Sequence, residues 1–251
     1  MSASVERFSN RVQNYVKYRP GYPPEMLQFF KDRLGLTQDF VIADIGSGTG
    51  FSAKPFLDNG NIVYGVEPNA AMREAAELLL QKHDRFRSVN GTSNRTGLPD
   101  NFVDLVIAAQ AFHWFDPETT QNEFKRILKP GGYVCLIWNE RQLDSTPFLR
   151  EYEQLLLKYA NDYEKVRHEN INDAVLENFF QQRFERATFN IHQILDLDGL
   201  KGRVMSSSYM PNETDPKYGP MVEELSTLFA KHAEGGKITI LYDTRLFYSQ
   251  F

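Results

Sequence analysis

Residues 40–50 read Phe-Val-Ile-Ala-Asp-Ile-Gly-Ser-Gly-Thr-Gly, and this stretch decides the fold. Its first half, Phe40 to Ile45, is an apolar run that predicts a buried strand of a parallel sheet. Gly46, Gly48 and Gly50 then follow at every second position. Such glycines let the backbone turn sharply and approach a ligand where any Cβ would clash. Residues from Phe51 onward can start a helix, whose free N–H groups would face the same loop.

Asp44 lies on the last turn of this strand and aims a carboxylate at the predicted crevice. A carboxylate there suits a ligand with ammonium or hydroxyl groups and repels one made mainly of phosphates. Two other glycine-rich loops are excluded. A dinucleotide fingerprint needs glycine at position 51, which is phenylalanine, and no GxxxxGK string followed by Ser or Thr occurs. The alternative is that the glycines only form a turn. It is disfavoured, because Asp44, the strand before the loop, the spacing of the glycines and the helix start after them all indicate a ligand-binding loop.

Asp-Ile-Gly-Ser-Gly-Thr-Gly, residues 44–50, resembles the first motif of the class I S-adenosylmethionine-dependent methyltransferases. The resemblance implies contacts to S-adenosylmethionine from Ser47 and Thr49 as well as the glycines. It also implies an α/β fold with a doubly wound, seven-stranded, mostly parallel, Rossmann-like sheet and a helical lid. Strands alternating with helices over residues 40–139 independently predict the doubly wound sheet.

Three regions are expected along the chain. They are an N-terminal lid segment over residues 1–36, an S-adenosylmethionine-binding core over 37–140, and a helical substrate cap with the last strands over 141–251.

A second acidic residue follows the second predicted strand, residues 62–66. The gap before this strand leaves room for one helix of about ten residues. An acid at the tip of the second strand hydrogen-bonds ribose hydroxyls in nucleotide-binding sheets, so we favour this role for Glu67 over plain solvation. Pro68 starts the next helix, residues 70–82, in which Met72 is expected to point toward the adenine side.

The segment before the first strand is rich in tyrosine and proline. Residues 5–17 favour a helix and 24–30 a second one, while prolines hold residues 15–23 extended. In the small-molecule branch of the resembling family, a segment with this Tyr…Tyr-Arg-Pro pattern folds over the cofactor. The resemblance implies that Tyr18 contacts the cofactor and that Arg19 pairs with its methionine carboxylate. The alternative is that these tyrosines pack on the surface.

A short third strand, residues 86–90, leads into Gly-Thr-Ser at 91–93. In the resembling family a loop here holds the adenine amino group, which implies a role for Thr92 and Ser93. Family members often carry an acid in this loop, whereas the chain has none there. The backbone or the Ser93 hydroxyl would then supply the adenine contact.

The fourth predicted strand, residues 102–108, opens on the aromatic and amide-rich stretch 109–116. Ligands bind at this end of open α/β sheets. The stretch resembles small-molecule methyltransferases related to trans-aconitate methyltransferase. It supplies cofactor candidates Gln110 and Ala111 and substrate candidates Phe112, His113 and Trp114. His113 is also a candidate general base, although a carboxylate acceptor has no proton to remove, so packing or substrate contact is the alternative.

A helix over 118–128, a Pro-Gly-Gly turn and a fifth strand over 133–138 come next. The strand's exit lies again at the crevice, where Trp138 and Arg141 are substrate candidates, the latter for an acidic substrate. Further on, the patterns predict helices over 148–159, 172–180, 197–205 and 221–232 and strands over 184–191 and 237–251. The last strand is expected at the antiparallel edge of the sheet. Tyr209 is a substrate candidate by position, with Arg203 and Ser207, and structural polar roles are the alternative.

The amino-acid composition limits which functions and cellular locations are expected. The chain has 251 residues with 28 basic and 33 acidic side chains, a net charge of −5, which argues against a nucleic-acid-binding surface. The single cysteine, Cys135, allows no disulfide within the chain and fits a reducing compartment. No long apolar stretch or signal-peptide core occurs, so we expect a cytoplasmic protein without a membrane partner, as a monomer or homodimer. The five histidines have no metal-ligand spacing, so no metal is expected.

The sequence therefore predicts methyl transfer from S-adenosylmethionine to a small molecule, with a carboxylate acceptor suggested by Arg141 and by the resemblance. The sulfonium is already an activated leaving group, so the enzyme mainly aligns donor and acceptor in a dry pocket. Trp114, Phe112 and Tyr18 are candidates for stabilising the sulfonium with their ring faces. A tRNA, rRNA or protein methyltransferase, a nicotinamide oxidoreductase and a non-catalytic S-adenosylmethionine-binding protein remain as alternatives.

Overall fold

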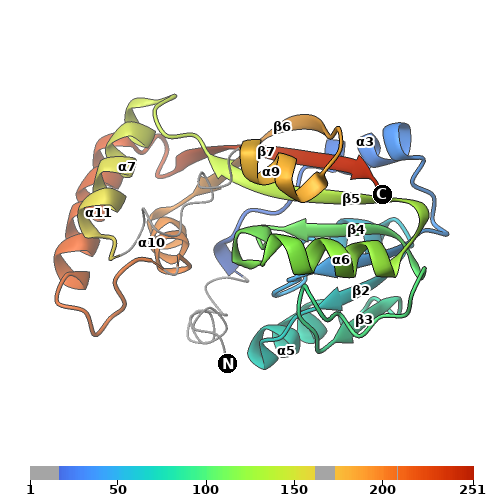
Figure 1. Ribbon diagram of the computed structural model, residues 1–251. Helices are drawn as coiled ribbons and strands as arrows, with labels where there is room; N and C mark the ends of the chain where they lie inside the picture. The colour runs from blue at the N-terminus through green and yellow to red at the C-terminus, as the bar shows by residue number, and fades with distance from the viewer. Residues whose placement is uncertain (1–16, 162–172, 208) are drawn as a thin grey trace.

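The computed structural model describes residues 17–161, 173–207 and 209–251. Within them the strands form one seven-stranded sheet in the order β3-β2-β1-β4-β5-β7-β6 (Figure 1). The strands are β1 (Val41–Ile45), β2 (Ile62–Val66), β3 (Phe86–Val89), β4 (Val103–Ala109), β5 (Leu128–Arg141), β6 (Glu185–Leu195) and β7 (Ile238–Gln250). Strands β1 to β5 are parallel, and β7 is antiparallel to β5 and β6. The predicted doubly wound, mostly parallel sheet is confirmed.

Helices cover both faces of the sheet, which explains why its central strands are apolar on both sides. One face packs against α3 (Pro24–Leu34), α4 (Lys54–Asp58) and the end of α5 (Ala70–Leu79). The other packs against α6 (Pro117–Ile127) and α9 (Asp173–Phe180). Along β4 the side chains alternate between these two cores, with Val106 in one and Ile107 in the other.

A third apolar core lies beyond one end of the sheet. It is built on α7 (Pro147–Tyr159), α10 (Leu197–Met205) and α11 (Tyr218–His232). Figure 1 shows these helices at the left, where the long strands β5 and β7 run out to meet them. We call these three helices the cap.

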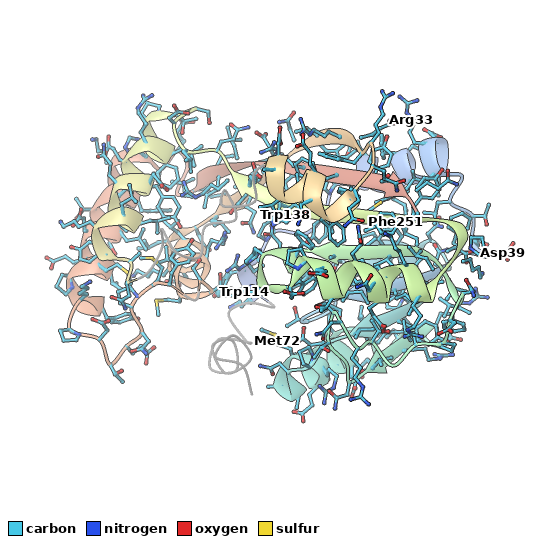
Figure 2. The ribbon with its side chains drawn as sticks, viewed as in Figure 1. Arg33, Asp39, Met72, Trp114, Trp138 and Phe251 are labelled. Atoms are coloured by element: carbon cyan, nitrogen blue, oxygen red, sulfur yellow. The ribbon has the colours of Figure 1, made fainter. Side chains whose placement is uncertain are left out.

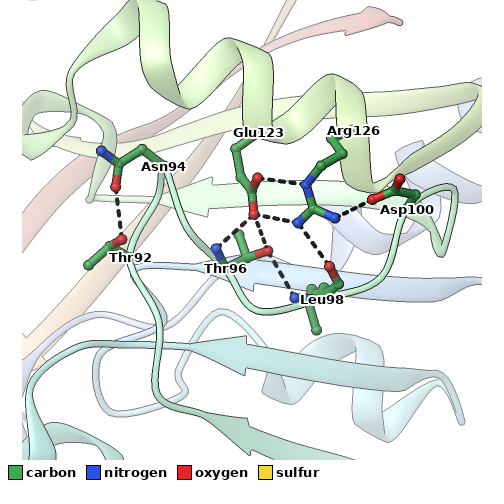
Figure 3. A network of polar contacts seen from close by, with 7 residues as sticks. All are labelled: Thr92, Asn94, Thr96, Leu98, Asp100, Glu123 and Arg126. Atoms are coloured by element: carbon green, nitrogen blue, oxygen red, sulfur yellow. Dashed lines mark hydrogen bonds and ion pairs between the residues drawn. The ribbon is translucent and has the colours of Figure 1, made fainter.

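The loop after β3 is fastened to α6 by a carboxylate network (Figure 3). The Glu123 carboxylate accepts hydrogen bonds from the backbone N–H and the hydroxyl of Thr96, at 2.8 and 2.6 Å. The Arg126 guanidinium also donates to Glu123 and reaches Asp100. These bonds, that from Arg126 above all, lower the pKa of Glu123 to about 2. The network fixes residues 96–100 beside α6.

Two sequence expectations about the elements are wrong. The helix of about ten residues expected after the glycine loop is the five-residue α4, because Asn59 and Gly60 end it and Gly60 adopts a φ of +96°. The last strand, β7, is not the edge of the sheet, because β6 pairs along its outer side. The helix expected over residues 5–17 falls almost wholly outside the described residues, as does the first residue of the helix expected over 172–180.

Candidate active site

The glycine loop after β1 presents bare main chain at the carboxyl end of the sheet. Gly46 and Gly48 have φ angles of +70° and +53°, in the left-handed region that glycine adopts without strain. A Cβ on Gly46 would lie 2.6 Å from the Cβ of Ala111, so no side chain fits there. A Cβ on Gly48 would meet nothing within 4 Å, so this side of the loop is open.

A cleft lies against this loop. The cleft is lined by Tyr22, Gly46, Ser47, Gly48, Thr49, Phe51, Ser52, Glu67, Pro68, Asn69, Met72, Ala109, Gln110, Ala111, Trp114 and Phe115.

Glu67 links the tip of β2 to the glycine loop. Its Oε2 accepts the backbone N–H of Gly48 at 3.1 Å, and its Oε1 accepts that of Asn69 at 2.9 Å. Burial raises the pKa of Glu67, and the two N–H groups oppose this rise. The carboxylate is thereby held in one orientation at the wall of the cleft, where its remaining lone pairs suit ligand hydroxyls.

Asp44 lies fully buried behind the cleft lining. Its Oδ2 accepts a hydrogen bond from the Ser52 hydroxyl at 2.6 Å, and Ser52 itself lines the cleft. Desolvation by burial raises the pKa of Asp44 to about 7. Among the described residues, Asp44 Oδ1 and Thr49 Oγ1 are buried without a hydrogen-bond partner. Buried polar atoms of this kind are what a bound polar ligand would satisfy.

Gln110 is held in a strained conformation at the cleft. Its φ of +57° lies in a region that costs a non-glycine residue about 1 kcal/mol or more. Two hydrogen bonds to β5 stabilise it, from its N–H to the carbonyl of Ile137 and from its side-chain amide to the carbonyl of Asn139. The strained residue thus joins the ends of β4 and β5.

Aromatic side chains also line the cleft. Trp114 is 37% exposed, and Figure 2 shows it with Met72 at the end of the sheet that faces the cap. Trp114 belongs to the short 3-10 helix η1 (Phe112–Trp114), which turns its neighbour Phe112 into the core against Phe179, 4.5 Å between ring centroids. The short helix η1 thus places Phe112 in the core and Trp114 in the cleft lining.

Most of the predicted cofactor residues come together at the cleft. Those that line it are Gly46, Ser47, Gly48, Thr49, Glu67, Pro68, Met72, Gln110 and Ala111, together with the substrate candidate Trp114. Gly50 instead packs on Leu80. Thr92 donates to Asn94 and Ser93 accepts from Thr120, so the described structure does not bring these two to the cleft.

Tyr18 and Arg19 lie against the cap rather than in the cleft lining. The Tyr18 ring packs on Gly202, where a Cβ would lie 2.0 Å from it. Arg19 Nη2 donates to the carbonyl of Ser206 at 3.1 Å. Tyr22, four residues after Tyr18, is the member of this segment that lines the cleft.

The other substrate candidates are also placed away from the lining. Phe112 and Trp138 are about 1% exposed in the core, so they serve packing. His113 lies beside Trp114, 4.9 Å between ring centroids. Tyr209 packs against the cap core. Arg141 forms a buried ion pair with Glu153 on α7, so the expected role in meeting an acidic substrate is not supported by its position.

Several cleft residues were not named as site residues from the sequence. They are Tyr22, Phe51, Ser52 and Asn69, together with Ala109 and Phe115, which belong to the stretch 109–116 expected at the crevice. Asn69 had a local signal, because it caps α5 by accepting the N–H of Met72. Phe51 lines the cleft at the position where a dinucleotide fingerprint needs glycine, in keeping with the exclusion of that class.

Within the described ranges, no group of three or more His, Cys, Asp or Glu side chains is placed to hold a metal ion. Those ranges also contain no helix with both the length and the apolar character needed to cross a membrane.

Comparison with known proteins places this geometry in a family. The methyltransferase domain family matches residues 43–136, which include the last three residues of β1, the glycine loop, Glu67 and most of β5. An uncharacterized methyltransferase-like protein of Schizosaccharomyces pombe is 25% identical over 253 residues, covering 98% of this chain and 96% of that protein. A probable S-adenosylmethionine-dependent methyltransferase of Saccharomyces cerevisiae is 29% identical over 189 residues, covering 68% and 62% of the two chains.

The fold has a counterpart among solved structures. A protein from Anaeromyxobacter dehalogenans, provisionally described as a type II methyltransferase, superposes with a TM-score of 0.69 at 18% identity, covering 93% of this chain and 98% of that one. The order of the strands, the glycine loop and the acid at the tip of β2 therefore point to the same kind of protein as the family match. Residues 43–136 therefore carry a methyltransferase domain, and the chain is an S-adenosylmethionine-dependent methyltransferase.

Proposed function

We propose that this methyltransferase acts on a small molecule and that the acceptor group is a carboxylate, which yields a methyl ester. The observation that carries the proposal is the cleft itself. It is lined by bare glycine main chain and by the aromatic side chains of Tyr22, Trp114 and Phe115, at the end of the sheet that faces the cap. Such a cleft suits a small acceptor that must be shielded from water.

The chemistry of the lining supports a carboxylate acceptor. Among the described lining residues, Glu67 and Tyr22 are the titratable members, the Glu67 carboxylate already accepts two backbone N–H groups, and no histidine, the commonest general base, is present. A carboxylic acid is already deprotonated at neutral pH, so it needs no base before it attacks. Alignment of the two reactants is then the main task of the protein.

The residues of the cleft fit S-adenosylmethionine. Glu67 suits ribose hydroxyls, and the open side of Gly48 admits the ligand against the main chain. The Glu67 carboxylate in the lining favours a ligand that carries positive charge. When bound, S-adenosylmethionine supplies a methyl group whose bond to sulfur breaks, with the electron pair kept by sulfur, as the acceptor oxygen bonds the methyl carbon.

Arg141 is not part of this proposal. Its guanidinium pairs with Glu153 and lies 5.0 Å from the centre of the Tyr152 ring. Its charge is therefore already compensated inside the cap. A nucleic-acid or protein acceptor is the competing proposal, and the net charge of −5 disfavours nucleic acid.

The test is methyl transfer from S-adenosylmethionine with a labelled methyl group to a metabolite extract and, separately, to RNA and protein. We expect label in the small-molecule fraction and its release as volatile methanol in base, because methyl esters hydrolyse. Glu67→Ala should abolish transfer, while Glu77→Ala, an exposed acid on α5, should leave it unchanged. Label confined to RNA or protein, or stable to base, would contradict the proposal.

A further inference from the structure

A guanidinium lies buried inside the cap without a carboxylate partner. Arg203 on α10 is 8% exposed. Its Nε donates to the Tyr242 hydroxyl at 3.1 Å, and its Nη1 donates to the hydroxyls of Ser207 and Ser206 at 3.1 and 3.4 Å. Among the described residues no Asp or Glu pairs with Arg203, and its Nη2 makes no hydrogen bond.

Two more guanidiniums belong to the same region. The charges of Arg141 and Arg203 both act on the buried hydroxyl of Tyr152, and Arg19 donates to the carbonyl of Ser206. Glu153 is paired with Arg141. Arg203 is therefore the member of this region whose hydrogen-bond partners among the described residues are all neutral hydroxyls.

Such an arrangement is costly unless a ligand completes it. Burying a cation without a counter-charge is unfavourable, and neutral hydroxyl oxygens offset only part of the lost solvation. An anion at Nη2 would supply the missing charge. A carboxylate matches the planar fork of a guanidinium with two parallel hydrogen bonds.

The position of Arg203 connects the cap with the cleft. Tyr242, which accepts from Arg203, donates to Gln193 Oε1 at 2.8 Å, and Gln193 Nε2 donates to the carbonyl of Tyr18 at 3.1 Å. From Tyr18 the chain continues to Tyr22 in the cleft lining. These hydrogen bonds therefore link Arg203 to the segment that leads into the cleft.

We propose that Arg203 anchors the methyl acceptor by a carboxylate group, an inference that rests on the proposed function. The cap then selects carboxylate-bearing acceptors, and Tyr242 and Ser207 orient the guanidinium that binds them. The methionine carboxylate of the cofactor is a second source of the same chemistry, so the experiment must separate the two.

The first arm measures the cofactor. Calorimetry gives the Kd of S-adenosylhomocysteine and of methylthioadenosine, which lacks the amino-acid carboxylate, for the wild type, Arg203→Met, Arg203→Lys and Lys201→Met. Lys201→Met is the matched control, because it removes a cation from the same helix. We expect all four proteins to bind each nucleoside equally. Weaker binding of S-adenosylhomocysteine alone to Arg203→Met would assign Arg203 to the cofactor and overturn the proposal.

The second arm titrates acetate, succinate and citrate, at constant ionic strength, into each protein saturated with S-adenosylhomocysteine. We expect at least one carboxylate to bind the wild type and Lys201→Met equally, and Arg203→Met roughly tenfold or more weakly. Arg203→Lys should fall between, since it keeps the charge but loses the fork. Equal carboxylate binding by Arg203→Met, or none by a wild type that binds S-adenosylhomocysteine, would overturn the proposal. Absence of nucleoside binding to the wild type would instead contradict the proposed function.

Discussion

Glu67 Oε2 accepts a hydrogen bond from the backbone N–H of Gly48 at 3.1 Å, so the tip of β2 holds the glycine loop that follows β1. The two elements are neighbours in the sheet, with Asp44 opposite Gly65 in the register. One carboxylate therefore both shapes the loop and faces the cleft. Removing it should affect the loop and the ligand together.

Replacing Glu67 by alanine is expected to weaken S-adenosylhomocysteine binding by about 10- to 100-fold, the effect of losing hydrogen bonds to a charged group. Calorimetric titration measures the change. Glu77→Ala on the exposed side of α5 removes the same charge and should bind like the wild type. Equal affinity of Glu67→Ala and wild type would show that Glu67 holds no part of the ligand.

Alanine at Gly46 and at Gly48 should have different effects. Both have positive φ, but a Cβ on Gly46 meets Ala111 at 2.6 Å, whereas a Cβ on Gly48 meets no protein atom. Gly46→Ala should therefore destabilise the protein more than the roughly 1 kcal/mol of backbone strain expected for Gly48→Ala. Gly48→Ala should keep the fold and weaken S-adenosylhomocysteine binding, because its methyl group points into open space at the cleft.

Urea denaturation and calorimetry on both variants measure stability and binding separately. Gly21→Ala, where a Cβ would also meet nothing within 4 Å, serves as the control outside the loop. A Gly48→Ala protein with wild-type affinity would contradict the placement of the ligand against this loop.

Asp44 should make the protein less stable as the pH rises. Burial raises its pKa to about 7 in the folded protein, whereas an unfolded aspartate titrates near about 4. The folded state therefore holds the proton more tightly, and the free energy of unfolding falls as the pH rises from about 4 to about 7, by at most about 4 kcal/mol. Asp44→Asn should remove this dependence in denaturation curves measured across that range. A wild type and variant with parallel pH profiles would refute it.

Glu123 should show the opposite trend. The Arg126 and Thr96 hydrogen bonds lower its pKa from 4.5 to about 2 (Figure 3). Its stabilising effect is present above about pH 4.5 and is lost as the pH falls toward about 2, with a magnitude of about 2 kcal/mol after solvent screening. Glu123→Gln should lack this acid-sensitive part, while Glu118→Gln, exposed on the same helix, should keep it. Acid denaturation monitored by circular dichroism tests the difference.

The core of the fold could be predicted because its signals are local. Strand β2 has the predicted bounds, since an apolar run ending at an acid specifies a buried strand without reference to distant residues. The same holds for α10, which begins after the capping Asp196 at the predicted residue. The glycine loop and Glu67 meet at the cleft for the same reason, because adjacent parallel strands bring their carboxyl ends together.

Contacts between segments that are far apart in the sequence could not be predicted from such local signals. Arg141 follows a strand at the crevice, but the docking of α7 brings Glu153 to it and removes it from the substrate side. Strand β6 became the edge of the sheet because β7, later in the sequence, inserts between it and β5. Tyr22 reaches the cleft through the path of an extended segment that no periodicity describes.

The central claim is that the glycine loop and Glu67 form the binding site of S-adenosylmethionine. A crystal structure of the full chain with S-adenosylhomocysteine tests it most directly. We expect density for the nucleoside in the cleft, with its ribose hydroxyls on the Glu67 carboxylate and its chain along Gly46–Gly50. Well-defined nucleoside density at any other place on the molecule would contradict the account.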